Sequence, residues 1–473
     1  MRSEKDLLGT RDVPSAALYG VQTLRATENF AITGIKLKHF PQLVNALAMV
    51  KKAAARANAK LGLLEPDKKD AICQACDEII AGQWHSHFVV DVIQGGAGTS
   101  TNMNANEVIA NRALEILGYQ RGDYKHLHPN NHVNLSQSTN DAYPTAIRLS
   151  ILLSHGEYVR ALSTLCYTLK QKAVEFADVV KMGRTQLQDA VPITLGQEFD
   201  AWYSTLKEDI EEAKDVVEFF REINMGATAI GTGINTDPAY SSLVIEELCH
   251  ISGKEMVQAK NLIEATSDMG AFVTFSSVLK RNAVKLSKIC NDLRLLSSGP
   301  RAGLQEINLP AMQPGSSIMP GKVNPVIPEM VNQVAFQVIG NDITVTMAAE
   351  AGQLQLNVME PVIAFNVLQS LRLQIRAVET LADKCISGIS ANREHCLSTV
   401  NNSIGIITAL NPYIGYDNAT RLAKQAIEGQ HSVRDLVLQE QLLSREALDD
   451  ILSVENMTAP RRVRSSAVHS NAV

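Results

Sequence analysis

Apolar residues recur every three or four positions through the middle of the chain, which is the period of an amphipathic helix. One such stripe predicts a continuous helix over residues 266–296, ended by Gly299-Pro300. Its members are Met269, Phe272, Phe275, Leu279, Ala283, Leu286, Ile289, Leu293 and Leu296. A second stripe predicts a helix over residues 195–221 that buries Phe199, Trp202, Leu206, Ile210, Val217 and Phe220.

Prolines mark the expected starts of three more long helices. These helices are expected from Pro144 to about 176, from just after Pro325 to about 352, and from just after Pro361 to about 388. Helices of about 25–30 residues exceed the globular mean and are typical of a long bundle. The pattern therefore predicts a mainly α fold in three parts. They are an N-terminal domain (1–137), a central long-helix bundle (138–395), and a small helical C-terminal domain (396–473) with a basic, mobile tail.

Composition narrows the class of protein. The chain has 473 residues, 45% of them hydrophobic, and a net charge of −6, so we expect a soluble globular protein without a nucleic-acid partner. The N-terminus lacks the apolar core of a signal peptide, and nowhere do about 18 apolar residues run uninterrupted, so no membrane association is expected. Seven scattered cysteines indicate reduced thiols and a cytoplasmic location.

The segment 315–325 is the most informative loop of the chain. It gathers Ser316, Ser317, Lys322 and Asn324 between glycines, and Asn324-Pro325 is typical of an N-cap followed by the first helical position. Hydroxyls, a cation and the free N–H groups of a helix start together favour a carboxylate ligand. The alternative at this point is a Gly/Ser/Pro turn that joins two helices.

Three other polar segments accompany this loop. The first contains Thr99, the second contains Ser138, Thr139 and Asn140, and the third contains Thr185 and Gln186. The second and third segments come just before expected helices. If the helices at Pro144 and Leu195 are antiparallel neighbours, their starts lie about 40 Å apart, too far for one ligand. Symmetry-related subunits would bring both starts together. The sequence thus predicts a homo-oligomer with a shared site.

Residues 315–325 resemble the GSSxMPxKxNP loop of the aspartase/fumarase superfamily, whose members eliminate a group from a succinyl-type substrate to give fumarate. The resemblance extends from Leu8 to about Asn456. It implies an all-α fold with a long central bundle flanked by two smaller, mostly helical domains. It also implies a homotetramer with active sites shared between subunits. No motif implies a required cofactor or a metal site, and the sequence leaves activation by Mg²⁺ open.

Within the superfamily, the aspartase branch, which deaminates L-aspartate to fumarate and ammonia, is the more similar. Segments 23–30 and 131–134 resemble that branch, and Thr139 stands where class II fumarases usually have serine. Gln186 replaces a histidine that fumarases, and some aspartases, have at this position, and a neutral amide cannot take up a proton near neutral pH. Glu329 matches the glutamate that pairs with this histidine. The alternatives are a class II fumarase and an inactive structural homologue. The intact site residues speak against the inactive homologue, because such a protein would not need them.

The resemblance also implies a role for each site residue. Ser316 is the base that removes a proton from C3, with Lys322 and loop amides promoting its ionisation. The expected ligands are Thr99, Ser138, Thr139 and Ser317 for the β-carboxylate of the enediolate (aci-carboxylate) intermediate, Thr185, Lys322 and Asn324 for the α-carboxylate, and Asn140 and Gln186 for the amino group. His126, His128 and His132 are interpreted as surface histidines, with an activator anion site as the alternative. The glycine-rich segment 226–233 is expected to be a structural turn.

Overall fold

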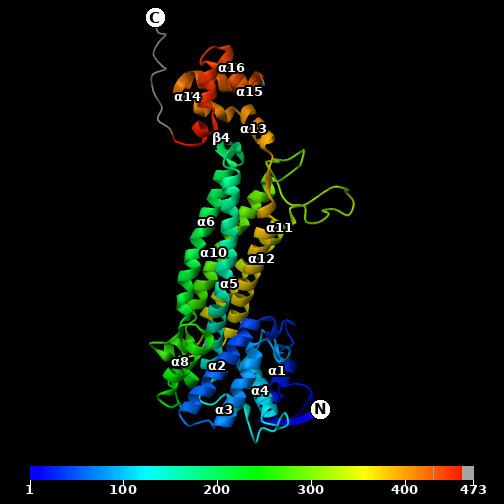
Figure 1. The fold of residues 1–473 in the computed structure, drawn as a ribbon, viewed down its shortest axis with the longest axis vertical. Helices are drawn as coiled ribbons and strands as arrows, with labels where there is room; N and C mark the ends of the chain where they lie inside the picture. The colour runs from blue at the N-terminus through cyan, green and yellow to red at the C-terminus, as the bar shows by residue number, and fades with distance from the viewer. Residues whose placement is uncertain (430, 461–473) are drawn as a thin grey trace. The chain divides into compact units, whose positions relative to one another are not determined.

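The computed structural model describes residues 1–429 and 431–460 and is mainly α-helical, as predicted (Figure 1). The predicted basic tail lies, from residue 461 onward, outside the described residues. The chain divides into two compact units. The first comprises Met1–Arg160, Asp209–Ala283 and Val334–Ile375, and the second comprises Ala161–Glu208, Val284–Gln333 and Arg376–Val473. The division into three domains stays a prediction.

The first unit begins with an antiparallel pair of strands and continues as helices, with α1 to α4 packed together in blue to cyan (Figure 1). Its strands are β1 (Arg2–Asp6), β2 (Gly9–Val13), β5 (Glu222–Ile223) and β6 (Val257–Gln258), the last two paired in parallel. Its shorter helices are α1 (Val21–Asn29), α2 (Pro41–Lys60), α3 (Pro66–Ile80), α4 (Thr99–Ile116), α7 (Thr228–Gly231), α8 (Tyr240–Ser252) and α9 (Leu262–Ser267). Single turns occupy Leu37–His39, His85–His87 and Pro129–Val133.

The second unit contains a β-hairpin and a cluster of short C-terminal helices. Its strands are β3 (Val180–Thr185), β4 (Gln188–Thr194), β7 (Ile307–Asn308) and β8 (Ser390–Ala391). Its short helices are α13 (Arg393–Asn402), α14 (Ile407–Ile414), α15 (Tyr416–Gly429), α16 (Val433–Gln439), α17 (Arg445–Ile451) and α18 (Val454–Thr458), with single turns at Ile386–Gly388 and Ile404–Ile406. Val180 and Met182 of β3 belong to the same apolar core as Leu410, Leu422 and Val437, so this core holds the base of the hairpin.

Five long helices pass through both units. They are α5 (Thr139–Glu175), α6 (Leu195–Val216, followed by a 3-10 turn at Val217–Phe220), α10 (Gly270–Leu296), α11 (Val326–Glu350) and α12 (Glu360–Lys384). All nine residues of the first predicted stripe and all six of the second are buried, which confirms both patterns. Among the described residues, no helix has the length and hydropathy needed to cross a bilayer.

The first stripe was predicted to form one continuous helix. This prediction was wrong, because the helix is interrupted at Asp268. Helix α9 ends at Ser267, and Asp268 adopts an extended backbone with φ −75° and ψ 132°. Its carboxylate then accepts the N–H of Gly270 at 2.9 Å, which satisfies a free donor at the start of α10. The apolar period continues across the break, so the pattern alone did not reveal it.

Helix α5 begins at Thr139 and not at Pro144, so the prediction for this helix start was wrong. Pro144 lies inside the helix, where its missing N–H leaves the carbonyl of Asn140 without its usual partner. The side-chain amide of Asn224 donates to that carbonyl at 2.9 Å. A side chain distant in sequence thus offsets the proline. Residues 139–141 of the polar segment form the first turn of α5, and Ser138 directly precedes it.

The segment 183–189 was predicted to stand just before a helix at Leu195. Helix α6 does begin at Leu195, but β4 lies between, and the segment contains the tip of the β3–β4 hairpin. Gln186 and Leu187 make the turn with φ +53° and +63°, the left-handed backbone that two-residue hairpin turns require. Glycine and asparagine favour such turns, and neither is present at these two positions. The sequence therefore carried no local signal for the hairpin.

Candidate functional site

Thr99 is positioned by a glycine at the start of α4. Gly98 has φ +87°, and a Cβ added there would lie 2.1 Å from the ring of Tyr143 on α5. This close approach brings Thr99 to the first turns of α5. The Thr99 hydroxyl donates to the carbonyl of Gly96 at 2.7 Å and is exposed.

We expect Gly98→Ala to lower the free energy of unfolding by more than Gly118→Ala does. Gly118 has a similar φ of +82° and no atom within 4 Å of an added Cβ, so its substitution adds only left-handed strain of about 1–2 kcal/mol. Gly98→Ala adds the collision with Tyr143, which costs about 1–3 kcal/mol more. Urea unfolding of the two variants measures the difference. Equal losses would contradict the close approach.

The first turn of α5 is held by hydrogen bonds to the side chains of Ser138 and Asp141. The hydroxyl of Ser138 accepts the N–H of Asn140 at 3.2 Å, which leaves its own hydrogen free to donate. Buried Asp141 accepts the N–H groups of Ser138 and Gly226, each at 2.9 Å. Burial raises the pKa of Asp141 to about 6, although these two N–H groups oppose the rise.

A buried lysine, which the sequence reasoning missed, lies beneath this turn. The amine of Lys51 donates to the side-chain oxygens of Asn102 (2.6 Å), Gln137 (2.8 Å) and Asn134 (3.0 Å). Asn102 in turn donates to the hydroxyl of Thr139 at 3.3 Å. Burial lowers the pKa of Lys51 to about 7, although the Asp141 carboxylate opposes the fall. Lys51 falls at helical spacing from the apolar residues Leu47 and Ala54, and this position was the signal that could have been noticed.

In the second unit, Thr185 and Gln186 stand exposed at the hairpin tip. The hairpin is held by buried Glu306, which accepts Arg184 at 2.6 Å and pairs with Lys181 at 2.9 Å. Burial lowers the pKa of Lys181, but the carboxylates of Glu198 and Glu306 outweigh it, and the net pKa is raised. Since Glu306 directly precedes β7, it links the hairpin to the segment that leads into the Ser316 loop.

The Ser316 loop is closed at its base by two hydrogen bonds. The N–H of Gly315 donates to the carbonyl of Lys322 at 2.7 Å, and the side-chain amide of Asn324 donates to the carbonyl of Gly315 at 2.8 Å. Helix α11 begins two residues after Asn324, within one residue of the predicted start. The loop therefore precedes a helix N-terminus, as its sequence indicated.

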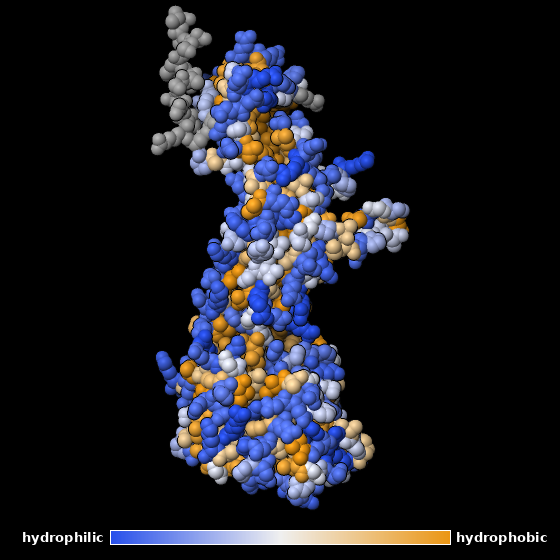
Figure 2. Space-filling view, viewed as in Figure 1, coloured by the Kyte–Doolittle hydropathy of each residue, from blue (hydrophilic) through white to orange (hydrophobic). Residues whose placement is uncertain are grey.

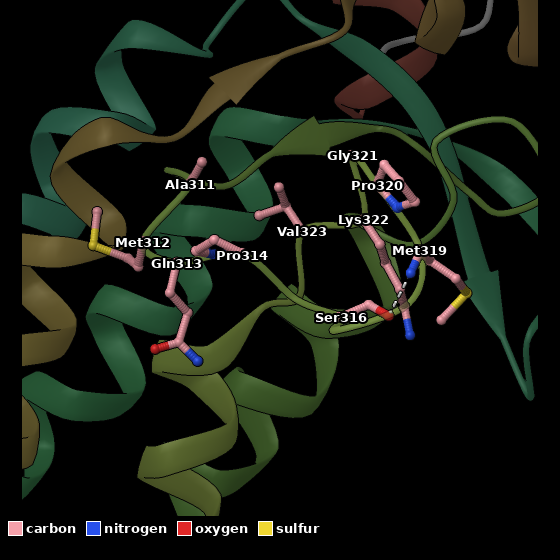
Figure 3. A pocket seen from close by; sticks show the side chains of 10 residues that line it. All are labelled: Ala311, Met312, Gln313, Pro314, Ser316, Met319, Pro320, Gly321, Lys322 and Val323. Carbon is pink, nitrogen blue, oxygen red and sulfur yellow. Dashed lines mark hydrogen bonds between the residues drawn. The ribbon is translucent and has the colours of Figure 1, made fainter.

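Ser316 accepts two backbone N–H groups of its own loop. The N–H of Met319 lies 2.9 Å and that of Ile318 lies 3.2 Å from Ser316 Oγ. Ser316 and Lys322 both line a hollow of about 520 Å³, and Figure 3 shows their polar atoms on the same side of it. Ile318 is 84% exposed, so no described residue covers this apolar loop tip. Figure 1 shows the loop leaving the helices as an open yellow-green trace.

Each unit thus brings together some of the predicted residues. The first unit gathers Thr99 and Ser138 to Asn140, and the second gathers Ser316, Ser317, Lys322 and Asn324 in one loop. The three histidines make contacts within the protein. His128 Nδ1 accepts the N–H of Asn130 at 3.0 Å, His132 lies 3.2 Å from the Lys68 amine, and His126 stacks on Tyr119. An activator anion site at these histidines stays a prediction.

Family models match most of the chain. The model described as Lyase matches residues 9–340, and the model described as Fumarase C C-terminus matches residues 406–459. The chain therefore belongs to the aspartase/fumarase superfamily of lyases.

Among curated relatives, aspartate ammonia-lyase of Pseudomonas aeruginosa is 63% identical over 463 residues, covering 98% of each chain. Aspartate ammonia-lyase of Escherichia coli K12 is 56% identical over 461 residues, covering 97% of this chain and 96% of the relative. A crystal structure named fumarate lyase:delta crystallin from Brucella melitensis, bound to cobalt, superimposes with a TM-score of 0.94 at 59% identity over 97% of this chain and all of that one. The crystal structure of a class II fumarase from Schistosoma mansoni superimposes with a TM-score of 0.89. It is 38% identical, and the match covers 96% of this chain and 98% of that one.

Proposed function

We propose that this protein catalyses the reversible deamination of L-aspartate to fumarate and ammonia, with Ser316 as the base. Aspartate ammonia-lyases that match nearly the whole chain support the reaction. The observation that carries the mechanism is the pair of N–H groups donated to Ser316 Oγ by Ile318 and Met319. Hydrogen bonds to a charged form favour that form, so these donors lower the cost of ionising the hydroxyl.

The reaction begins with removal of a weakly acidic proton from C3 of aspartate by Ser316. The electron pair moves into the β-carboxylate, giving an enediolate with a second negative charge, and preorganised donors stabilise that charge. Lys322, which lines the same hollow as Ser316, supplies a cation. The electron pair of the enediolate then forms the double bond of fumarate between C2 and C3 while the C–N bond breaks. The nitrogen is already protonated as an ammonium group in the substrate, so it leaves as ammonia without needing a strong acid.

The remaining polar residues bind the two ends of the substrate. Ser138 retains a free hydroxyl hydrogen for a carboxylate, whereas Thr99 must release the carbonyl of Gly96 before it can donate. We assign Thr99, Ser138, Thr139 and Ser317 to the β-carboxylate, Thr185, Lys322 and Asn324 to the α-carboxylate, and Asn140 and Gln186 to the amino group. Buried Lys51 and Asn102 support Thr139 from below.

A homotetramer with shared sites forms part of the proposal. Helix α11 exposes an apolar face in the first unit, with Phe336 at 62%, Ile343 at 58% and Met347 at 67% exposure. Residues spaced by three, four and seven share one helix face, and such a stripe marks a protein–protein contact. Figure 2 shows further apolar surface, in orange, over the long helices.

The proposal includes a cytoplasmic location and no required cofactor. Six of the seven cysteines are buried thiols, which suits a reducing compartment. None of the assigned roles needs a metal ion. Activation by Mg²⁺ is a separate question that a titration of the purified protein with the ion would answer.

The ultraviolet absorbance of fumarate tests the reaction directly. With the purified protein, we expect this absorbance to rise after addition of L-aspartate and to stay constant after addition of L-malate. Gln186 in place of a titrating histidine is the reason to expect no hydration or dehydration. A rise with L-malate alone would instead identify a fumarase, and no rise with either would identify an inactive homologue.

A further inference from the structure

Asn140, at the start of α5, has three of its four polar groups engaged within the first unit. Its N–H donates to the hydroxyl of Ser138 at 3.2 Å, and its carbonyl accepts the amide of Asn224 at 2.9 Å. Its side-chain Nδ2 donates to the carbonyl of Ala229 at 2.7 Å. The side-chain Oδ1 has no hydrogen-bond partner among the described residues.

The contact with Ala229 decides which way the Asn140 side chain faces. Amide oxygen and nitrogen are hard to tell apart by shape, but a backbone carbonyl can only accept a hydrogen bond. The group that faces Ala229 must therefore be the NH₂ of Asn140. Its Oδ1, an acceptor with no hydrogen to donate, is the atom left for a ligand.

Ala229 has an unusual backbone, with φ +64° and ψ −82°. A residue with a Cβ adopts this conformation only under strain, and strain of this kind persists only where the surroundings impose it. Here the surroundings do so on both sides. The hydroxyl of buried Thr228 donates to the carbonyl of Ile234 at 2.6 Å, and the N–H of Gly231 donates to the carbonyl of Ala227 at 2.6 Å.

Gly231 holds the other side of this turn against α9. A Cβ added to Gly231 would lie 2.5 Å from the Cα of Ile263, so the two backbones are in direct contact. The segment is also fastened to α5 by Asn224 and by the N–H of Gly226, which donates to Asp141. The strained carbonyl of Ala229 is thus fixed relative to Asn140 from several directions.

We propose that Ala229 is a positioning residue whose strained carbonyl orients Asn140, so that Asn140 Oδ1 accepts a hydrogen bond from the amino group of the substrate. The inference rests on the proposed function and specifies the atom that recognises the leaving group. An ammonium group carries only donors, so it requires an acceptor such as Oδ1. A flipped amide would present two N–H groups and repel it.

The amination of fumarate, run as the reverse reaction, separates binding of ammonia from binding of fumarate. In Ala229→Gly the strain is released and the carbonyl is free to turn away. We expect the KM for ammonia to rise about tenfold, the loss of a well-placed hydrogen bond to a charged group, while the KM for fumarate changes less than twofold. Resistance to urea unfolding should stay equal or increase, because glycine adopts this backbone without strain.

Two further variants make this result decisive. Asn140→Leu removes the acceptor, so it should raise the KM for ammonia at least as much as Ala229→Gly does. Gln441→Gly relaxes another left-handed residue, with φ +52°, in the second unit and should change neither KM. Equal changes in both KM values, or no change, in Ala229→Gly would overturn the assignment. A wild-type protein unable to aminate fumarate would instead overturn the proposed function itself.

Discussion

Ser316→Ala is expected to lower kcat for aspartate deamination by at least about 10²–10⁴-fold, the usual contribution of a positioned general base. The methyl group cannot take the C3 proton, while the groups assigned to the substrate carboxylates remain in place. The variant should therefore still bind aspartate. Steady-state kinetics and calorimetric binding of aspartate to the variant together measure the two quantities.

Ser398→Ala serves as the matched control for this substitution. Ser398 is an exposed serine on α13 in the same unit as Ser316, and its hydroxyl accepts a long contact of 3.4 Å from Asn402. We expect wild-type turnover from this control. Near-wild-type turnover from Ser316→Ala would remove Ser316 from the role of base, and loss of aspartate binding would show that the loop had been disturbed instead.

Mixed oligomers of two impaired variants are expected to be more active than either parent at limiting aspartate. Asn140→Ala and Ser316→Ala damage the two units separately. If Asn140 and Ser316 reach one site from different subunits, random mixing leaves about a quarter of the sites with both residues intact. Co-expression of two differently tagged chains, followed by purification of the mixed oligomer, provides the material. Its deamination rate should approach that fraction of the wild-type rate.

A second mixture tests whether this recovery comes from shared sites. Thr139→Ala and Asn140→Ala alter adjacent residues in the first turn of α5, so they always belong to the same subunit's contribution. Their mixed oligomer should be no more active than the parent variants. A site built within one chain predicts no recovery in either mixture, because every chain then carries a defect in its own site.

The long helices could be predicted from the sequence because their signal is local. Phe272, Phe275 and Leu279 repeat at helical spacing, and their burial confirmed the stripe. The same signal did not indicate the break at Asp268, because the apolar period continues through it. A capping interaction of one side chain, which does not disturb the period, ended one helix and began the next.

The candidate site was predicted only in part. The residues of the loop 315–325 were readable because hydroxyls, a cation and a helix start lie within one short segment. The buried residues beneath the site could not be predicted in this way. Lys51 binds Asn102, Asn134 and Gln137, which lie 51 to 86 positions away in the sequence. A buried amine with three acceptors is defined by those partners and by nothing near it in the chain.

The sequence by itself determined the helical class, the buried faces and the chemistry of the Ser316 loop, because each depends on residues within a few turns of one another. Tertiary structure alone decided that Pro144 lies inside α5, that Gln186 turns a hairpin and that Ala229 is strained. In each case a distant group supplies what the local chain lacks. Asn224 binds the carbonyl freed by the proline, the C-terminal core holds the strand before Gln186, and α9 packs against the turn beyond Ala229.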